Sequence, residues 1–391
     1  MVGGAGEGQA HGWEAPLTPI SFEFVGWLLA GPALFWSLPP RWRSSSLAGT
    51  GLALLIRLDV TAALYTLGLV GVAVALTRKG ISGWVAALAV LMSVGMFAGL
   101  RLSRMEEGVA TSLPLGLAYA VPRFIQVMIE GWRQPRRVSF PDLMAYFLFA
   151  PALVAGPVHS LEPFERNLRR IRWDGQQFSL GCTRVLYGYV RMVLLADTLV
   201  PWLFQHWRWF FGHVYPWLDE WMAAAEYGAD LYLTFSGYSE VAVGAALLFG
   251  ITLPENFDRP FLAHNLPTFW RSWHSSLSGW CRSFVYEPVA ALSRSAAVGV
   301  MFSMGVLALW HEFSGRYVLW GVWHGLGLVV WQGWQRLRPR LGPPLSPAWE
   351  KRTRVLSVIL TQLFVVAGFS ITRAPDLPSA LAGLRTLLGG G

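Results

Sequence analysis

Long apolar runs separated by short polar breaks dominate the hydropathy pattern of the chain. Runs of about 20 residues, long enough for a helix to cross the hydrocarbon core of a bilayer, recur along it. Clear examples are residues 20–38, 81–100, 298–310 with its flanks, 316–335 and 355–371. Their helical length favours spanning helices over membrane strands. The pattern therefore predicts an all-α polytopic membrane protein with about ten membrane-embedded helices.

One apolar run, residues 142–157, has flanks that argue against a simple span. Basic clusters lie on both sides of it, at 133–137 and 165–172. A span would place these clusters on opposite faces of the membrane, against the tendency of basic loops to stay on the cytoplasmic side. A re-entrant pair of half-helices that turns near Gly156 and Pro157 would keep both on one face. We therefore expect some embedded helices to be re-entrant or broken.

Composition supports a membrane protein, and the charge pattern bears on which side of the membrane its loops face. Of the 391 residues, 54% are hydrophobic and only 14% are charged, against about 25% charged in soluble domains. The net charge of +8 is typical of topogenic arginines in cytoplasmic loops, and we predict no nucleic-acid partner. Cys182 and Cys281 stand far apart in apolar surroundings, so neither a disulfide framework nor a thiolate metal site is indicated. We expect a single integral membrane domain over residues 1–391.

The segment FWRSWHSSLSGW, residues 269–280, is unusually polar for a membrane span. Prolines at 254, 260 and 267 break the preceding chain, and Asn265 is placed to cap a helix that begins near Thr268. Helical spacing gives an apolar face of Trp270, Trp273, Leu277 and Trp280, and a polar face of Arg271, Ser275, Ser278 and Arg282. Two interpretations fit this pattern. The helix lies at the membrane interface with an aromatic belt, or it forms the wall of a polar cavity.

A second cluster, LALWHEFSGRYVLWGVWHGLGLVVW at 307–331, contains two histidines. Ser314 and Gly315 offer a turn, which predicts two spans joined by a short hairpin. His311 then lies near the membrane surface, whereas His324 lies about 12 Å inside the next span. An ionisable residue at that depth indicates a functional site, because an unpartnered imidazole in lipid is costly. The alternative is a hydrogen-bonded structural histidine at a helix interface, where glycines at GxxxG spacing let another backbone approach closely.

Six blocks, in order, resemble the membrane-bound O-acyltransferases (MBOAT), and in particular the bacterial branch of alginate O-acetyltransferase and teichoic-acid D-alanyl transfer proteins. They are YFLFAPALVAGPVHSLEPF (146–164), GYVRMVLLADTLVP (188–201), ADLYLTFSGYSEVAVGAALLFGITLPENFDRPF (229–261), FWRSWHSSLSGWCRSFVY (269–286), LWHEFSGRYVLWGVWHG (309–325) and FSITRAPDLPSAL (369–381). The resemblance covers most of the chain from about residue 139. It implies an MBOAT fold around a polar tunnel, with N-terminal spans in 1–138 and the catalytic core in 139–391.

The resemblance also implies which residues act. His324 matches the family's catalytic histidine and His274 its second functional histidine, and the sequence leaves open whether His274 orients the base, polarises the thioester carbonyl or protonates the leaving thiolate. Other residues expected to bind substrate or line the tunnel are His311, Arg271, Trp273, Tyr238, Ser239 and Asn256. No metal and no bound cofactor are expected. The acyl donor is a thioester, either acetyl-CoA or an acyl-phosphopantetheine carrier protein.

The implied reaction acylates a hydroxyl of an extracytoplasmic polysaccharide at the bacterial inner membrane. A secreted or periplasmic SGNH-like acyltransferase, or an acyl carrier protein, is the implied partner. Three departures from the family pattern bear on the acceptor: Thr234 replaces an aspartate, Ser283 follows Arg282 where an aspartate is usual, and no LGG follows Pro288. The match of the blocks to the alginate branch favours acetyl transfer. The alternative is D-alanyl transfer from a carrier-protein thioester to teichoic acid or a partner protein. The rival classes are a proton-coupled transporter of envelope precursors and a structural scaffold.

Overall fold

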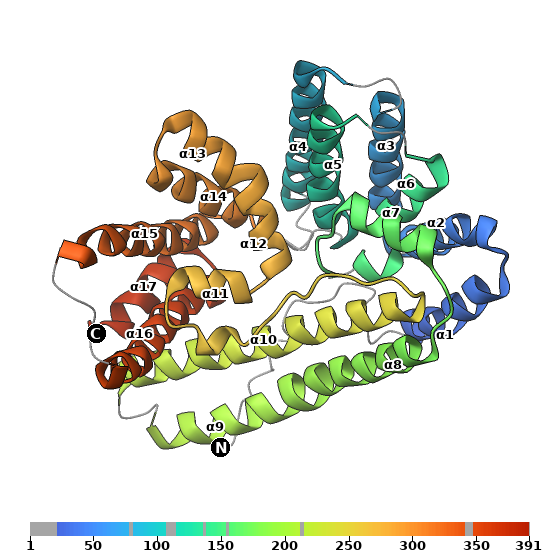
Figure 1. Ribbon diagram of the computed structural model, residues 1–391. Coiled ribbons are helices and arrows are strands. Elements are labelled where there is room, and N and C mark those ends of the chain that lie inside the picture. The colour runs from blue at the N-terminus through green and yellow to red at the C-terminus, as the bar shows by residue number, and fades with distance from the viewer. Residues whose placement is uncertain are drawn as a thin grey trace. The chain divides into compact units, whose positions relative to one another are not determined.

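The chain is helical throughout the part that the structure describes. The computed structural model describes residues 22–77, 81–106, 115–135, 138–153, 156–211, 215–340 and 347–390, and all named elements in these ranges are helices (Figure 1). The β-type pairing in the described residues is one isolated bridge between Phe257 and Trp273. The predicted all-α class is confirmed. The chain divides into two compact units, each described here by itself.

The first unit comprises residues 1–156, 160–178 and 245–251. Its helices are α1 (Phe22–Ser37), α2 (Pro40–Leu58), α3 (Val60–Thr77), α4 (Gly83–Glu106), α5 (Leu115–Arg133), α6 (Phe140–Phe147), the 3₁₀ turn η1 (Ala150–Ala152) and α7 (Leu161–Arg170). Helices α3 and α4 both pack against α5, and α2 packs against α6 (Figure 1). The run 142–157 is broken, as predicted, but the break between α6 and η1 lies at Leu148 and Phe149, ahead of the turn expected near Gly156 and Pro157. Residues 154 and 155 lie outside the described part, so the re-entrant arrangement stays a prediction.

A buried arginine explains how α6 ends where it does. Arg123 on α5 is fully buried. Its NH1 donates to the carbonyl oxygens of Tyr146 and Phe147, at 3.2 Å each, and its NH2 donates to the carbonyl oxygen of Ala152 at 2.6 Å. The last carbonyls of a helix have no partner within the helix. Arg123 therefore caps α6 and fixes η1, which stabilises a broken helix in a run that is apolar enough to continue.

Replacing Arg123 by methionine should destabilise the protein strongly. Three buried carbonyl groups would lose their donor, and each such loss costs about 1–3 kcal/mol. We expect a loss of roughly 3 kcal/mol or more, measured as a lower unfolding temperature of the purified protein in detergent. Arg133→Met is the matched control, because Arg133 ends the same helix but is exposed. Equal unfolding temperatures for the two variants would contradict the capping role.

The second unit comprises residues 157–159, 179–244 and 252–391. Its elements are α8 (Gly175–Tyr189) from residue 179, the π-helical stretch η2 (Val190–Leu199), α9 (Val200–Phe211), α10 (Pro216–Leu248) up to residue 244, η3 (Pro260–Leu262), α11 (Leu266–Ser272), α12 (Ser275–Cys281), η4 (Arg282–Tyr286), α13 (Glu287–Ser293), α14 (Ala296–His311), α15 (Gly315–Leu337), η5 (Arg338–Arg340), α16 (Pro347–Arg373) and α17 (Leu377–Leu387). Helices α14 and α15 form a hairpin at the turn that the sequence predicts (Figure 1), and Ser314 caps α15 there.

Several helices have the length and composition of membrane spans. Within the described residues these are Val60–Thr77, Gly83–Ser103, Pro216–Leu248 and Thr353–Arg373, with Phe24–Ser37 and Ala296–His311 as shorter apolar helices. The predicted runs 81–100 and 355–371 lie in two of them, α4 and α16, and the run 316–335 forms α15. The number of embedded segments, about ten by hydropathy, stays a prediction.

Candidate active site

The candidate site is built around a break in the helix that the sequence predicts over residues 268–280. Asn265 caps α11 as expected, since its side-chain oxygen accepts from the Thr268 N–H at 2.8 Å. The continuous helix is wrong, however: α11 ends at Ser272 and α12 starts at Ser275. Between them Trp273 is extended, and His274 is left-handed with φ 45° and ψ 46°. The two predicted faces therefore do not continue across His274.

A distant segment holds this break in place. The Asp258 N–H donates to the Ser272 carbonyl at 3.0 Å, and the Ser275 N–H donates to the Asn256 carbonyl at 2.9 Å. The Ser275 hydroxyl also donates to the Glu255 carbonyl, at 2.7 Å. Backbone groups at 272 and 275 thus find partners outside their own helices, which offsets the helical hydrogen bonds that the break removes.

The side chain of Asn256 fixes the protonation pattern of His274. Both residues are buried, with 1% and 3% of their surface exposed. Asn256 Oδ1 accepts from the Ser276 N–H at 3.3 Å and from the Ser276 hydroxyl at 2.7 Å, and it lies 3.0 Å from His274 Nδ1. The Ser276 N–H can only donate, so this atom of Asn256 is the carbonyl oxygen. His274 Nδ1 must then carry the hydrogen, which leaves Nε2 as the acceptor nitrogen.

Two further bonds complete this network. Asn256 Nδ2 donates to the Ser239 hydroxyl on α10 at 3.1 Å, and the Val158 N–H donates to the Ser276 hydroxyl at 3.0 Å. His274 Nε2 is buried and has no hydrogen-bond partner among the described residues. The network therefore orients an imidazole whose remaining nitrogen is available to a substrate.

Replacing Asn256 by alanine should slow turnover about tenfold or more, because the ring of His274 would lose the bond that sets its orientation and tautomer. Initial rates of the purified variant, compared with its unfolding temperature, measure the effect. Asn256→Asp retains an oxygen that can accept from His274 Nδ1–H, so it should recover part of the rate. A wild-type rate for Asn256→Ala would show that His274 needs no such support.

His324 lies in the middle of α15 and is enclosed by aromatic rings. It is 2% exposed. Its ring centroid lies 5.3 Å from Trp270 on α11, 5.1 Å from Trp320 one turn earlier, and 5.6 Å from Phe364 on α16. Its Nδ1 is buried without a hydrogen-bond partner among the described residues. A neutral imidazole with such a nitrogen can accept a proton from a bound substrate.

The helix that carries His324 packs closely on α14 through glycines. A Cβ at Gly321 would lie 2.9 Å from both the Met304 carbonyl oxygen and the Ala308 Cβ. A Cβ at Gly325 would lie 2.7 Å from the Met301 sulfur. The close backbone approach expected from the GxxxG spacing is confirmed.

Ring contacts join the three histidines into one cluster. His311, at the end of α14, is half-buried, stacks on Tyr317 with centroids 5.7 Å apart and contacts Trp320 at 5.6 Å. Trp310 beside it contacts His274, with centroids 6.1 Å apart. The chain of ring contacts therefore runs His274, Trp310, His311, Trp320 and His324.

The other residues predicted for the site fall into three groups. Ser239 and Asn256 belong to the His274 network. Trp273 is buried among the rings of Phe257, Phe269 and Phe369, as a wall residue would be. Arg271 is exposed and donates to the Thr268 hydroxyl at 3.1 Å. Tyr238 is half-buried on α10, and neither residue belongs to the chain of ring contacts that joins the three histidines.

Sequence reasoning missed three contributors to this unit. Ser276 is one of the four serines in residues 269–280, and only the fold shows that it donates hydrogen bonds to Asn256. Glu312 and Arg316 form a two-bonded ion pair, at 3.0 and 2.5 Å, that joins the α14–α15 turn; their i, i+4 spacing was a readable signal. Arg316 NH1 also donates to the carbonyls of Thr372 and Ala374 at the end of α16.

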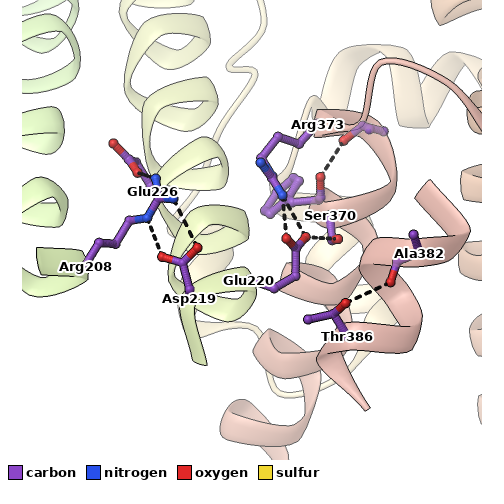
Figure 2. A network of polar contacts seen from close by, with 10 residues as sticks. Arg208, Asp219, Glu220, Glu226, Ser370, Arg373, Ala382 and Thr386 are labelled. Atoms are coloured by element: carbon purple, nitrogen blue, oxygen red, sulfur yellow. Dashed lines mark hydrogen bonds and ion pairs between the residues drawn. The ribbon is translucent and has the colours of Figure 1, made fainter. Parts of the chain in front are cut away.

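A further polar network fastens α16, which carries Phe364 against His324. Glu220 near the start of α10 accepts from the Ser370 hydroxyl at 2.5 Å and from Arg373 NH2 at 2.6 and 2.8 Å (Figure 2). Beside it Arg208 on α9 pairs with Asp219 at 2.8 Å (Figure 2). Among the described residues no group of three or more His, Cys, Asp or Glu side chains could hold a metal ion.

Comparison with known proteins adds independent evidence. Residues 125–367 match the model of the membrane-bound O-acyltransferase family. The probable alginate O-acetylase of Pseudomonas aeruginosa is 32% identical over 274 residues, which cover 68% of this chain and 50% of that protein. The teichoic acid D-alanyltransferase of Streptococcus thermophilus is 28% identical over 281 residues, covering 66% and 67%. The peptidoglycan O-acetyltransferase of Helicobacter pylori is 28% identical over 258 residues, covering 64% and 47%. The chain spans about half the length of the alginate relatives that it matches.

Proposed function

Because the chain belongs to the membrane-bound O-acyltransferase family, we propose that it transfers an acyl group from a thioester donor to a hydroxyl of a glycan. The observation that carries this proposal is the pair of buried histidines, His274 and His324, each with a ring nitrogen that has no partner among the described residues. A thioester is already activated, so the acceptor alcohol is the partner that needs help. A buried neutral imidazole supplies that help as a general base.

The reaction follows from these groups. His324 Nδ1 takes the proton of the acceptor hydroxyl while the hydroxyl oxygen attacks the thioester carbonyl carbon. The carbonyl electron pair moves to oxygen, and its return breaks the carbon–sulfur bond. The protonated histidine then gives its proton to the leaving thiolate, so the base is regenerated and a free thiol departs. His274, held by Asn256 through Nδ1, offers Nε2 to a hydroxyl of the bound acceptor and orients it toward His324.

We propose acetyl as the acyl group and an exported polysaccharide as the acceptor, by analogy with the alginate and peptidoglycan relatives. The donor is acetyl-CoA or an acyl-phosphopantetheine carrier protein, and a secreted or periplasmic SGNH-like acyltransferase is a candidate partner. We place the protein in the bacterial inner membrane as one integral domain, with N-terminal spans in 1–138 and the catalytic core in 139–391. The second candidate is D-alanyl transfer to teichoic acid, which the fuller coverage of the Streptococcus thermophilus relative favours.

A direct assay tests the proposal. Purified protein in nanodiscs is incubated with radiolabelled acetyl-CoA or a D-alanyl carrier protein, together with alginate, peptidoglycan fragments or teichoic acid. We expect one of the two donors to transfer its radiolabel to one of the glycans, in a linkage that alkali cleaves. The His324→Ala variant should leave the glycans unlabelled. A transporter would instead leave every glycan unlabelled and move an envelope precursor across vesicles; that outcome would refute the enzyme assignment.

We also propose that the acyl group crosses the membrane during the reaction, because thioester donors are cytoplasmic whereas the acceptor is exported. His324 is the tenth residue of α15, about 14 Å along the helix axis, so substrates can reach it from opposite faces. Sealed proteoliposomes of known orientation, with donor supplied on one face, should acylate only acceptor on the other face. Transfer to acceptor on the donor's own side would contradict this mechanism.

A further inference from the structure

The indole N–H of Trp270 stands out among the tryptophans of the second unit. Trp270 is 8% exposed, and its Nε1 is buried without a hydrogen-bond partner among the described residues. By contrast, Trp221 Nε1 donates to the Leu387 carbonyl at 3.2 Å, and Trp323 Nε1 donates to the Phe364 carbonyl at 3.1 Å. Buried donors in folded proteins are nearly always paired, so an unpaired one calls for an explanation.

The position of this N–H suggests the explanation. The Trp270 ring meets the His324 ring edge to face, with centroids 5.3 Å apart and an angle of 82° between the planes. It also packs on Trp320, at 5.7 Å and 74°, and on Phe269, at 5.7 Å and 82°. Two touching rings therefore hold one unpaired donor, Trp270 Nε1, and one unpaired nitrogen, His324 Nδ1.

These two atoms match the two polar needs of an acyl transfer. The acceptor hydroxyl must lose a proton, and the thioester carbonyl oxygen must take up negative charge as the carbon–oxygen bond forms. His324 Nδ1 serves the first need. We propose that Trp270 Nε1–H serves the second, by donating a hydrogen bond to the carbonyl oxygen of the bound acyl thioester. Trp270 is thus a catalytic residue that stabilises the oxyanion, an inference that rests on the proposed acyl transfer.

An indole is well suited to this task in apolar surroundings. It has one donor and no acceptor, so it can donate to the thioester oxygen but cannot take up the proton of the acceptor hydroxyl. The rings of Phe269, Trp320 and His324 fix its plane before the substrate arrives. A donor that is already oriented needs no reorganisation when charge develops on oxygen, which is the source of its catalytic effect.

The test removes the N–H and keeps the ring volume. Trp270→Phe removes the donor with part of the ring, and replacement of Trp270 by 3-benzothienylalanine removes only the N–H. We expect both to lower kcat roughly 10²-fold, the range seen when one oxyanion donor is lost. The KM for the donor should change little. The unfolding temperature of the benzothienyl variant should stay the same or rise, because no protein bond is lost.

Two matched controls separate catalysis from structure. Trp221→Phe removes a paired indole N–H and should lower the unfolding temperature while leaving kcat unchanged. Replacement of Trp27 by 3-benzothienylalanine removes another buried indole N–H that has no partner among the described residues, on a ring that contacts Phe24 and Phe249, and keeps the ring volume. This replacement should change neither kcat nor the unfolding temperature.

Several outcomes would overturn the inference. A benzothienyl variant with wild-type kcat would assign any loss in Trp270→Phe to ring volume. A lower unfolding temperature of the benzothienyl variant would show that the N–H has a structural partner. Where wild-type protein acylates a glycan and His324→Ala does not, either outcome for the benzothienyl variant refutes only the role of Trp270. Where wild-type protein transfers no acyl group, the proposed function itself is refuted.

Discussion

His324→Ala should lower acyl transfer roughly 10²-fold or more, because it removes the proposed general base. The substitution should leave the protein folded, since the rings of Trp270 and Trp320 still pack on each other and Phe364 still stacks on Trp323. The measurement is the initial rate of transfer by purified protein, set beside its unfolding temperature. The expected pattern is a large loss of rate with a small change in stability.

The other two histidines provide the comparison series. His274→Ala should impair transfer less than His324→Ala, because the role proposed for His274 is to orient the acceptor and not to take its proton. His311→Ala should be the mildest of the three, since His311 is half-buried at the end of α14. If His324→Ala kept a near-normal rate, or if His311→Ala were the most severe, the assignment of the base would be wrong.

Gly368→Ala should reduce transfer about 10²-fold without removing any polar group, because small displacements of a catalytic group are that costly. A Cβ at Gly368 on α16 would lie 2.7 Å from His324 Nε2 and 3.5 Å from its Cδ2. Contacts below 3.0 Å are not tolerated, so the imidazole must shift. Rates and unfolding temperatures of the purified variant measure the effect.

Gly305→Ala is the matched control. Gly305 also lies within a helix, α14, but a Cβ there would meet no atom within 4 Å. This variant should keep the wild-type rate and should be slightly more stable, because alanine is the better helix former by about 1 kcal/mol. Equal rates for the two alanine variants would show that the ring of His324 can move without loss, and would argue against its role as a positioned base.

Local signals in the sequence predicted local features of the fold. Asn265 before Pro267 predicted the start of α11, and Ser314-Gly315 predicted the α14–α15 turn, because helix caps depend on residues within one turn of the chain. The position of His324 along α15 followed from the same turn and the helical rise, whereas its depth in the membrane stays a prediction. These features need no knowledge of the tertiary structure, so a single sequence suffices for them.

The break at Trp273 and His274 could not be predicted in this way. Residues 269–280 have a regular helical pattern, and no proline or glycine lies between Ser272 and Ser275. The break is stabilised by the segment around Asn256, which is 18 residues earlier, and by the hydrogen bonds between the two. The resemblance to a family supplied Ser239, Asn256 and His274 as separate candidates, whereas the fold shows the bonds that connect them. Arg271 was predicted on the same continuous helix as His274. Because α11 ends at Ser272, Arg271 and His274 lie on different segments, and Arg271 is not part of the histidine cluster.

The left-handed backbone at His274 also limits which residues this position can accept in a mutational scan. With φ 45°, glycine and asparagine fit the backbone easily, whereas valine, isoleucine and threonine are strained there by their branched Cβ. A saturation library at this position should therefore separate into two populations. Glycine and asparagine variants should reach the membrane at normal abundance but lack the imidazole, and β-branched variants should be depleted by quality control before their chemistry can be measured.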